Sequence, residues 1–483
     1  MQVERRVLGN AASLGVGAII GQLANFGFVI LVARGFGREV FAQYALSMVI
    51  GGLACMLVSF GSISLLTRCS AQDLPRSIEM LRSVLPIQFG IAILVWILVA
   101  AAALLFSPTV ESLVILGCIV AHHIILRITG VLLAYLHGQE RMQTVAAVKV
   151  GRNIAMLAAG AALAFTTGNA MAGISAMPMT ALLFLLYTHG QLKSLIGPVS
   201  WRWDPPGAWH VAKQAFPFFL IIAVTAASDR LGPLMLSAIQ NPDALATYAS
   251  GERIITAAAI LYTMLTAASV PAASRFALSD RERFTSLANR ITRVVCLAML
   301  PVATVLFLFS DDIIAFMFGR EFATSAPVLR IVAWILVVRG INSVQAMAAV
   351  SASRQRDVLL ARGVGLAMIV VLGPPLIWKF GAAGLAWVML GAETAYSAVL
   401  HLRLRRLGIS LSLLRPAGAT LIACAVALAA GMLSQHMVLP ARIAVVGLSI
   451  VAGLWIFGAV RSHDLRYLLA ILKTKRSDYL EPG

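Results

Sequence analysis

The chain has 483 residues, of which 60% are hydrophobic and only 12% charged, and its mean hydropathy is +0.89. These values exclude an ordinary soluble domain and predict a polytopic membrane protein. The formal net charge of +18 would suggest nucleic acid as the partner of a soluble chain. In a membrane protein, basic residues in short loops indicate which side is cytoplasmic. We therefore expect no nucleic-acid partner.

The polar start of the chain carries Arg5 and Arg6 ahead of an apolar stretch that lacks an A-x-A cleavage signal. We therefore expect the first segment to stay as a membrane helix rather than to be removed as a signal peptide. The five cysteines are scattered and form no C-x-x-C pair. Their pattern predicts neither a disulfide framework nor a zinc site.

Apolar runs of about 17 to 25 residues predict fourteen membrane spans and an all-α fold. They lie near residues 13–33, 42–66, 86–106, 113–136, 145–166, 170–190, 216–238, 244–270, 292–310, 326–350, 363–379, 381–401, 416–434 and 440–460. An even number of spans places both termini on the same side of the membrane.

The basic residues test this topology, because short cytoplasmic loops carry an excess of Lys and Arg. With the N-terminus inside, 28 of the 38 Lys and Arg fall on the inner side, five on the outer side and five within or at the ends of spans. We therefore predict cytoplasmic N- and C-termini. The basic loop 275–293 and the basic tail 461–483 are expected to lie against anionic membrane lipid, or to act as topology determinants alone.

The longest polar connection, residues 191–214, combines basic residues with three tryptophans and a proline pair: Trp201, Trp203, Trp209 and Pro205-Pro206. Indole rings favour the headgroup level of a bilayer. The segment is therefore predicted to be an interfacial linker on the cytoplasmic face.

Short stretches of the first half recur in the second half. The segment VFAQYA at 40–45 returns as ALATYA at 244–249, an offset of 204 residues. Three further matches follow in order at offsets of 212 to 215: Arg127 with Arg339, Arg141 with Arg356, and Gly168 with Gly381. Transporters are commonly built from such repeats. We predict two six-helix lobes in pseudo-twofold repeat, with domains at 1–190 (N-lobe), 191–214 (linker), 215–402 (C-lobe), 403–460 (two C-terminal helices) and 461–483 (tail).

Arg127 and Arg339 each lie in the middle of the fourth span of a lobe. A guanidinium stays charged, so within a membrane it faces a water-filled cavity, a paired acid or an anionic ligand. Neither arginine has an acid three or four residues away. We expect both to line a substrate cavity. The alternatives are capture by the carbonyl group of a neighbouring helix and snorkelling to the headgroups.

Further polar residues within spans are candidate members of the same cavity. Asn342 and Gln345 follow Arg339 in the tenth span, and Gln22 and Asn25 lie in the first span. We predict that all four bind substrate. Glu393, in the twelfth span, is an isolated acid whose partner the sequence does not identify. It is assigned either to ion coupling or to a structural ion pair.

Two adjacent acid–arginine pairs occur in the seventh and eighth spans, Asp229-Arg230 and Glu252-Arg253. Both pairs are expected on the order of 13 Å below the outer surface, so cross pairing is feasible. They form either a structural ion-pair cluster or a cavity lining. In the second case an acid takes up a proton or sodium ion and Arg230 or Arg253 meets the substrate.

The sequence lacks common enzyme motifs, including HExxH, a P-loop and G-x-S-x-G. The adjacent His122 and His123 project about 100° apart on a helix, which does not suit a metal site. We therefore predict no enzyme, no catalytic residues, no metal and no cofactor. The excess of positive charge within spans favours a phosphate-bearing ligand, because arginine binds phosphate oxygens in bidentate fashion.

Three features carry a family resemblance: the stretch ARGFGREVFAQYALSMVIGGLACMLVSFGSISLLTR, the segment GREFATSAPVLRIVAW before the tenth span, and the repeated glycine turn before the sixth and twelfth spans. They resemble the polysaccharide transporter branch of the multidrug/oligosaccharidyl-lipid/polysaccharide exporter superfamily, which includes the O-antigen and exopolysaccharide repeat-unit flippases. The resemblance covers roughly residues 8 to 460.

The resemblance implies two six-helix lobes facing a cavity, and alternating access that moves an undecaprenyl-diphosphate-linked oligosaccharide from the cytoplasmic to the periplasmic leaflet of a bacterial inner membrane. It also implies a role in exopolysaccharide or lipopolysaccharide synthesis, with a polysaccharide polymerase and a chain-length regulator as further partners.

Three other functions stay open: a multidrug extruder, a peptidoglycan lipid-precursor flippase of the same superfamily, and a membrane polysaccharide polymerase or ligase. Enzymes of the last class have a large periplasmic loop. The predicted outer loops of this chain are all short.

Overall fold

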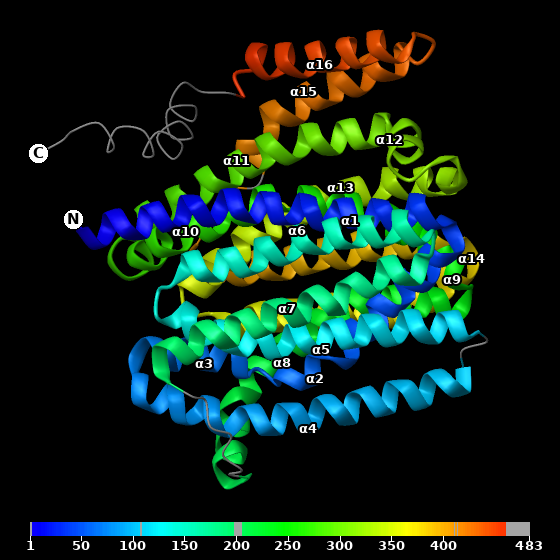
Figure 1. Cartoon of the computed structure of the whole chain (residues 1–483). Coiled ribbons are helices and arrows are strands. Elements are labelled where there is room, and N and C mark those ends of the chain that lie inside the picture. The colour runs from blue at the N-terminus through cyan, green and yellow to red at the C-terminus, as the bar shows by residue number, and fades with distance from the viewer. Residues whose placement is uncertain (1, 107–108, 198–204, 410, 413, 460–483) are drawn as a thin grey trace, which may run out of the picture. The chain divides into compact units, whose positions relative to one another are not determined.

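The computed structural model describes residues 2–106, 109–197, 205–409, 411–412 and 414–459. The predicted tail 461–483 lies outside these residues, as do positions 198–204 of the predicted linker 191–214. Within the described ranges every regular element is a helix (Figure 1). The predicted all-α fold is therefore confirmed.

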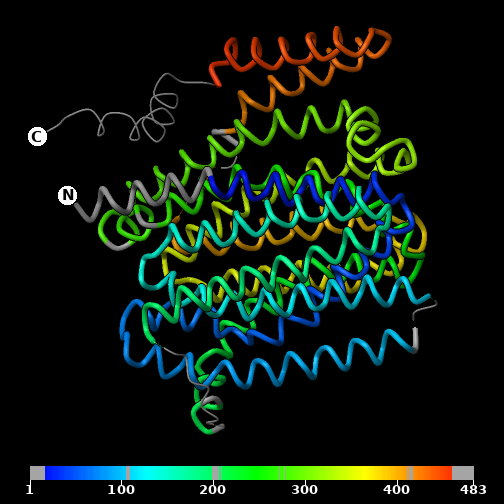
Figure 2. Tube along the Cα trace, viewed as in Figure 1, coloured from blue at the N-terminus to red at the C-terminus, as the bar shows by residue number. Residues whose placement is uncertain are grey.

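Seven α-helices form the first half of the chain: α1 Gln2–Ala54, α2 Met56–Ser59, α3 Ser62–Gln72, α4 Leu74–Phe106, α5 Val110–Gly138, α6 Met142–Thr167 and α7 Ala170–Ile196. The second half comprises α8 Pro205–Ile239, α9 Pro242–Ala258, α10 Ile260–Ser279, α11 Arg281–Leu308, α12 Ser310–Met317, the 3-10 helix η1 Arg320–Ser325, α13 Ala326–Ser351, α14 Gln355–Arg406, α15 Leu414–Leu433 and α16 Leu439–Ile456. The trace in Figure 2 follows this order from blue to red.

The described helices account for the fourteen predicted spans. Ten are long and apolar enough to cross a membrane, and the bent pair α9 and α10 together adds one. Two of the ten exceed a single span: α1 breaks at Gly37 (φ 81°) and α14 at Gly381 (φ 55°), conformations that glycine adopts readily. Each therefore supplies two spans, and the shorter apolar helix α15 completes the set.

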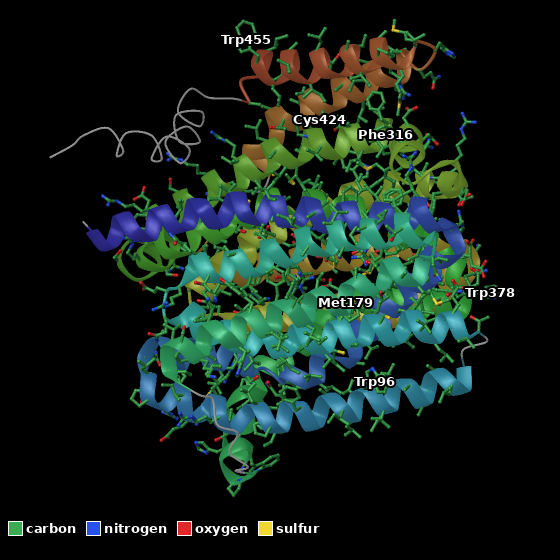
Figure 3. The ribbon with its side chains drawn as sticks, in the orientation of Figure 1. Trp96, Met179, Phe316, Trp378, Cys424 and Trp455 are labelled. Atoms are coloured by element: carbon green, nitrogen blue, oxygen red, sulfur yellow. The ribbon has the colours of Figure 1, made fainter. Side chains whose placement is uncertain are left out.

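Large apolar side chains lie on the outside of several long helices. Trp96 on α4 is 47% exposed and Trp455 on α16 is 82% exposed (Figure 3). Ile93 and Ile97 extend the exposed apolar side chains of α4. Such surfaces are stable against lipid acyl chains, in agreement with a multi-pass membrane protein.

The second predicted span is interrupted between α2 and α3. Phe60 and Gly61 both have positive φ, 39° and 75°. A Cβ at Gly61 would lie 2.5 Å from the carbonyl oxygen of Ala215 and 2.7 Å from the backbone nitrogen of Phe219. Glycine is therefore required for α8 to cross the second span at the interruption.

The chain divides into two compact units. The first unit consists of residues 13–249 and 373–382, and the second consists of the described parts of 1–12, 250–372 and 383–483. The first unit differs from the predicted N-lobe: it lacks residues 1–12 and adds α8, the first residues of α9 and residues 373–382 of α14. The lobe boundaries at 1–190 and 215–402 stay a prediction that rests on the sequence repeat.

Candidate functional site

Arg127 lies in the middle of α5 and is half-buried. Among the described residues, no hydrogen bond or ion pair joins its guanidinium to another side chain or to the backbone. Thr129, a polar neighbour on the same helix, donates its hydroxyl to the carbonyl oxygen of Ile125 at 2.7 Å. The charge of Arg127 is therefore not compensated by the described groups around it.

Positive charge also predominates on the helix that follows. The helices α5 and α6 contain one acid between them, Glu111 in the first turn of α5. Lys149 is exposed on α6, and Arg152 is half-buried and donates to the Asn153 side chain at 2.9 Å. Asn153 in turn donates to the carbonyl oxygen of Gly21 at 2.9 Å, which joins α6 to α1.

Gln22 and Asn25 lie on α1 next to this junction and are half-buried. The two helices approach closely because α1 carries glycines here: a Cβ at Gly17 would lie 3.2 Å from Val150 and one at Gly21 would lie 3.5 Å from it. The predicted polar residues of the first span are thus held near the cationic part of α6.

In the second unit Arg339 forms a buried ion pair with Glu393. Its Nε lies 2.9 Å from Oε1 of Glu393, whose side chain is 4% exposed. Asn342 donates to Oε2 of Glu393 at 2.8 Å and to its carbonyl oxygen at 3.0 Å. The structure therefore brings together three predicted site residues, and Glu393 is no longer an isolated acid.

A second arginine binds the same carboxylate. Nη1 of Arg362 lies 3.3 Å from both oxygens of Glu393, and its guanidinium lies 4.2 Å above the ring centre of Tyr396. We refer to Arg339, Asn342, Arg362, Glu393 and Tyr396 as the Glu393 cluster. The role of Arg362 was not predicted, since it lies 31 residues from Glu393.

Gln345 lies one turn beyond Asn342 on α13 and is fully buried. Its Oε1 accepts a hydrogen bond of 3.4 Å from the hydroxyl of Ser397 on α14. Gln345 thus joins the same two helices as the Glu393 cluster, and substrate binding by its side chain stays a prediction.

Arg230 lies on α8 and packs against the second span. It donates to the carbonyl oxygen of Met48 at 2.6 Å, and a methyl group on Gly52 would overlap its guanidinium. Asp229 is exposed beside it. The structure shows that Arg230 binds a helix carbonyl group, and its pairing with Glu252 stays a prediction.

Glu252 and Arg253 are half-buried on α9. Glu252 accepts a hydrogen bond of 3.5 Å from Thr256, and Nε of Arg253 is buried without a hydrogen-bond partner among the described residues. Cross pairing with Asp229 or Arg230 would join the two units and stays a prediction.

An ion pair that the sequence analysis missed joins the second spans of the two sequence repeats. Arg38, directly after the break of α1, binds both carboxylate oxygens of Asp243 on α9 at 2.5 and 2.9 Å. Its Nη2 also donates to the hydroxyl of Thr247 at 2.7 Å. The two partners are 205 residues apart, and no local pattern indicates their pairing.

Comparison with known protein families gives two matches. A model of the family described as polysaccharide biosynthesis protein matches residues 7–277, and the MatE model matches residues 217–375. No curated protein matches the chain in sequence.

Solved structures share the fold at low sequence identity. A lipid II flippase, MurJ, in an inward closed conformation is 15% identical with a TM-score of 0.73, and the match covers 94% of this chain and 100% of the flippase. An outward-facing multidrug resistance MATE family transporter is 16% identical with a TM-score of 0.62, covering 84% and 96%. An inward-facing one is 14% identical with a TM-score of 0.61, covering 80% and 95%.

Proposed function

Because the chain belongs to the polysaccharide biosynthesis protein family, within the multidrug/oligosaccharidyl-lipid/polysaccharide exporter superfamily, we propose that it is a lipid-linked oligosaccharide flippase. In this proposal it moves an undecaprenyl-diphosphate-linked repeat unit from the cytoplasmic to the periplasmic leaflet by alternating access. Both termini are cytoplasmic in this orientation, as the distribution of basic residues predicts.

The observation that carries the proposal is Arg127, a permanent cation in a membrane span that has no acid partner among the described residues. An uncompensated charge within a membrane is costly, so such residues usually serve a substrate pathway. A diphosphate provides the missing anion and offers oxygens for a bidentate contact. Lys149 and Arg152 on α6 extend the positive charge on the same unit.

The other arginines are further candidate contacts for the diphosphate. Arg339 binds Glu393 in the structure, so it requires an exchange of partners before it reaches a substrate. Arg230 is bound to the Met48 carbonyl group, and Arg253 has a buried Nε without a described hydrogen-bond partner. We therefore rank Arg127 above the others.

Coupling to a proton or sodium ion requires an acid that can change its charge or its ligands. Glu393 is held by two guanidiniums and an amide, which keep it paired. Asp229 and Glu252 are the other candidates for ion coupling. Contacts with anionic lipid, a polysaccharide polymerase and a chain-length regulator belong to the same proposal.

A peptidoglycan lipid-precursor flippase is the second candidate function. It is favoured by the similarity to the lipid II flippase, which extends over 94% of this chain with a TM-score of 0.73. Both candidates imply a diphosphate-linked substrate, so the site cannot separate them. Viability of a strain that lacks the protein separates them, because loss of a sole lipid-precursor flippase is lethal.

A multidrug extruder is less well supported, because the interiors of the first six predicted spans carry no acid for coupling. Increased drug sensitivity of a deletion strain would favour it. A polymerase or ligase lacks support from the solved structures that share the fold, which are a flippase and multidrug transporters.

The experiment is complementation of a deletion strain with wild-type protein, Arg127→Ala and the loop variant Arg141→Ala, at matched membrane abundance. We expect Arg127→Ala to abolish surface polysaccharide and Arg141→Ala to restore it. Full complementation by Arg127→Ala would remove this residue from the substrate site.

A further inference from the structure

Lys149 lies on the packed face of α6 and yet is exposed. Val145, four residues before it, and Met156, seven residues after it, are both buried. At about 100° per residue, all three side chains project within about 40° of one direction, whereas Ile154 projects about 140° from Lys149. Ile154 is 45% exposed and belongs to the apolar, lipid-facing side of the helix. Lys149 therefore lies away from the lipid, where the other described helices do not cover the packed face of α6.

Two like charges meet at this place without an acid. Lys149 and Arg152 are three residues apart on one helix face, and their charges repel each other. Among the described residues neither forms an ion pair, and α6 contains no Asp or Glu. Like charges at this spacing destabilise a helix. An anion bound between the two side chains would remove this repulsion.

The guanidinium of Arg152 is already held in place. Its Nε and Nη2 donate to Oδ1 of Asn153 at 3.3 and 2.9 Å, and Asn153 in turn donates to the carbonyl oxygen of Gly21 at 2.9 Å. Nη1 makes no hydrogen bond within the described part of the chain, so it stays available as a donor. A group that is fixed before the ligand arrives loses less entropy on binding.

Arg127 does not belong to this pair. It interacts with Cys55, and no electrostatic interaction joins it to Lys149 or Arg152 among the described residues. His122 on α5 does interact with Arg152, and it projects about 140° from Arg127 around the helix. Arg127 and Arg152 therefore lie on different sides of α5. A diphosphate bound at Arg127 leaves the charges of Lys149 and Arg152 uncompensated.

Side-chain amides lie beside the two cations. Asn153 follows Arg152 directly, and Gln22 and Asn25 lie on α1 next to Gly21, to which Asn153 is bound. An amide both donates and accepts hydrogen bonds, as the hydroxyl groups of a sugar require. Cations together with amides suit a sugar that carries a carboxylate. A lipid headgroup fits less well, because Lys149 lies away from the lipid-facing side of α6.

We propose that Lys149 and Arg152 bind a carboxylate of the glycan, so that the substrate is an acidic oligosaccharide that contains a uronic acid or another carboxylated sugar. The fixed guanidinium of Arg152 provides directed donors for the carboxylate, and Lys149 adds a point charge. The inference rests on the proposed function, since it assigns the chemical class of the glycan on the lipid-linked substrate.

The test measures the affinity of the purified full-length protein in detergent for trigalacturonate, with the neutral trisaccharide maltotriose as reference. We expect wild type to bind trigalacturonate about tenfold more tightly than maltotriose, and Lys149→Gln/Arg152→Gln to lose this preference. The control Arg141→Gln/Lys193→Gln removes the same charge from exposed positions of the same unit and should keep it. Equal affinity of wild type for the two sugars, or the same loss in both double variants, would overturn the proposal.

The single variant Lys149→Gln keeps the test decisive if the double variant fails to fold. Lys149 is exposed and makes no hydrogen bond to another described residue, so thermal unfolding should not change. Its affinity for trigalacturonate should fall about three- to tenfold, while its affinity for maltotriose stays the same. An unchanged affinity for trigalacturonate would contradict the assignment.

A lipid headgroup as the bound anion has its own signature. If wild type binds phosphatidylglycerol but not trigalacturonate, and Lys149→Gln/Arg152→Gln weakens that binding, the two cations hold a membrane lipid and the proposal is wrong. Loss of the trigalacturonate preference in Arg127→Ala would also contradict it, because the two sites would then not be separate.

Failure of the proposed function is distinguishable from failure of this inference. If wild type binds farnesyl diphosphate no more tightly than farnesol, the diphosphate-linked substrate itself is wrong. If wild type prefers farnesyl diphosphate over farnesol but does not prefer trigalacturonate over maltotriose, only the acidic glycan is wrong.

Discussion

Substitution of Gly52 by alanine tests the position of Arg230. A methyl group at this position would overlap the Arg230 guanidinium, which donates to the Met48 carbonyl oxygen at 2.6 Å. Displacement of the Arg230 guanidinium breaks this hydrogen bond from a charged group, which costs about 1.5–3 kcal/mol of stability. Replacement of a glycine within a helix by alanine stabilises the helix by about 0.5–1 kcal/mol. We therefore expect a net loss of about 0.5–2.5 kcal/mol in the free energy of unfolding.

The assay is thermal unfolding of the purified variant in detergent. Gly117→Ala on α5 is the matched control, because nothing lies within 4 Å of the added methyl group, and it should be neutral or stabilising. The double variant Gly52→Ala with Arg230→Ala should lose less stability than the two single losses combined, because both act on one contact. A Gly52→Ala protein as stable as Gly117→Ala would refute the reasoning.

Two further predictions concern other parts of the fold. Gly61→Ala should lower the stability of the protein more than Gly168→Ala does. Both glycines have positive φ, 75° and 63°. The added Cβ at position 61 would lie 2.5 Å from the Ala215 carbonyl oxygen, whereas no atom lies within 4 Å of one at position 168. Left-handed backbone alone costs about 1–2 kcal/mol, so equal losses in thermal unfolding would contradict the crowding at Gly61. Arg38→Ala should lower the free energy of unfolding by at most about 1 kcal/mol, because its partner Asp243 is largely exposed. High salt screens such a pair, so the loss of stability should become smaller at high salt. A loss that does not change with salt would contradict this prediction.

Hydropathy and the basic loops were sufficient to predict the membrane fold. The span count follows from segment length, which the bilayer imposes on every helix. The sequence repeat also identified backbone features: Gly168 and Gly381, matched at an offset of 213 residues, both adopt positive φ in the structure. The interruption at Phe60 and Gly61 was not predicted, because no proline marks it and the apolar run continues through it.

The candidate site was predicted residue by residue but not contact by contact. Arg339 and Arg127 occupy matching places in the repeat, yet Arg339 binds an acid 54 residues away and Arg127 has no acid partner among the described residues. A pairing between distant helices leaves no local pattern, so Glu393 could be recognised as unusual but not assigned a partner. For the same reason the role of Arg362 was not predicted.

The central claim is that Arg127 meets the diphosphate of the substrate. The most direct measurement is the affinity of purified wild-type and Arg127→Ala protein for farnesyl diphosphate, each compared with farnesol. Loss of one charge-assisted contact predicts binding about 10- to 100-fold weaker for farnesyl diphosphate and unchanged for farnesol. Equal affinity of the two proteins for farnesyl diphosphate would contradict the claim.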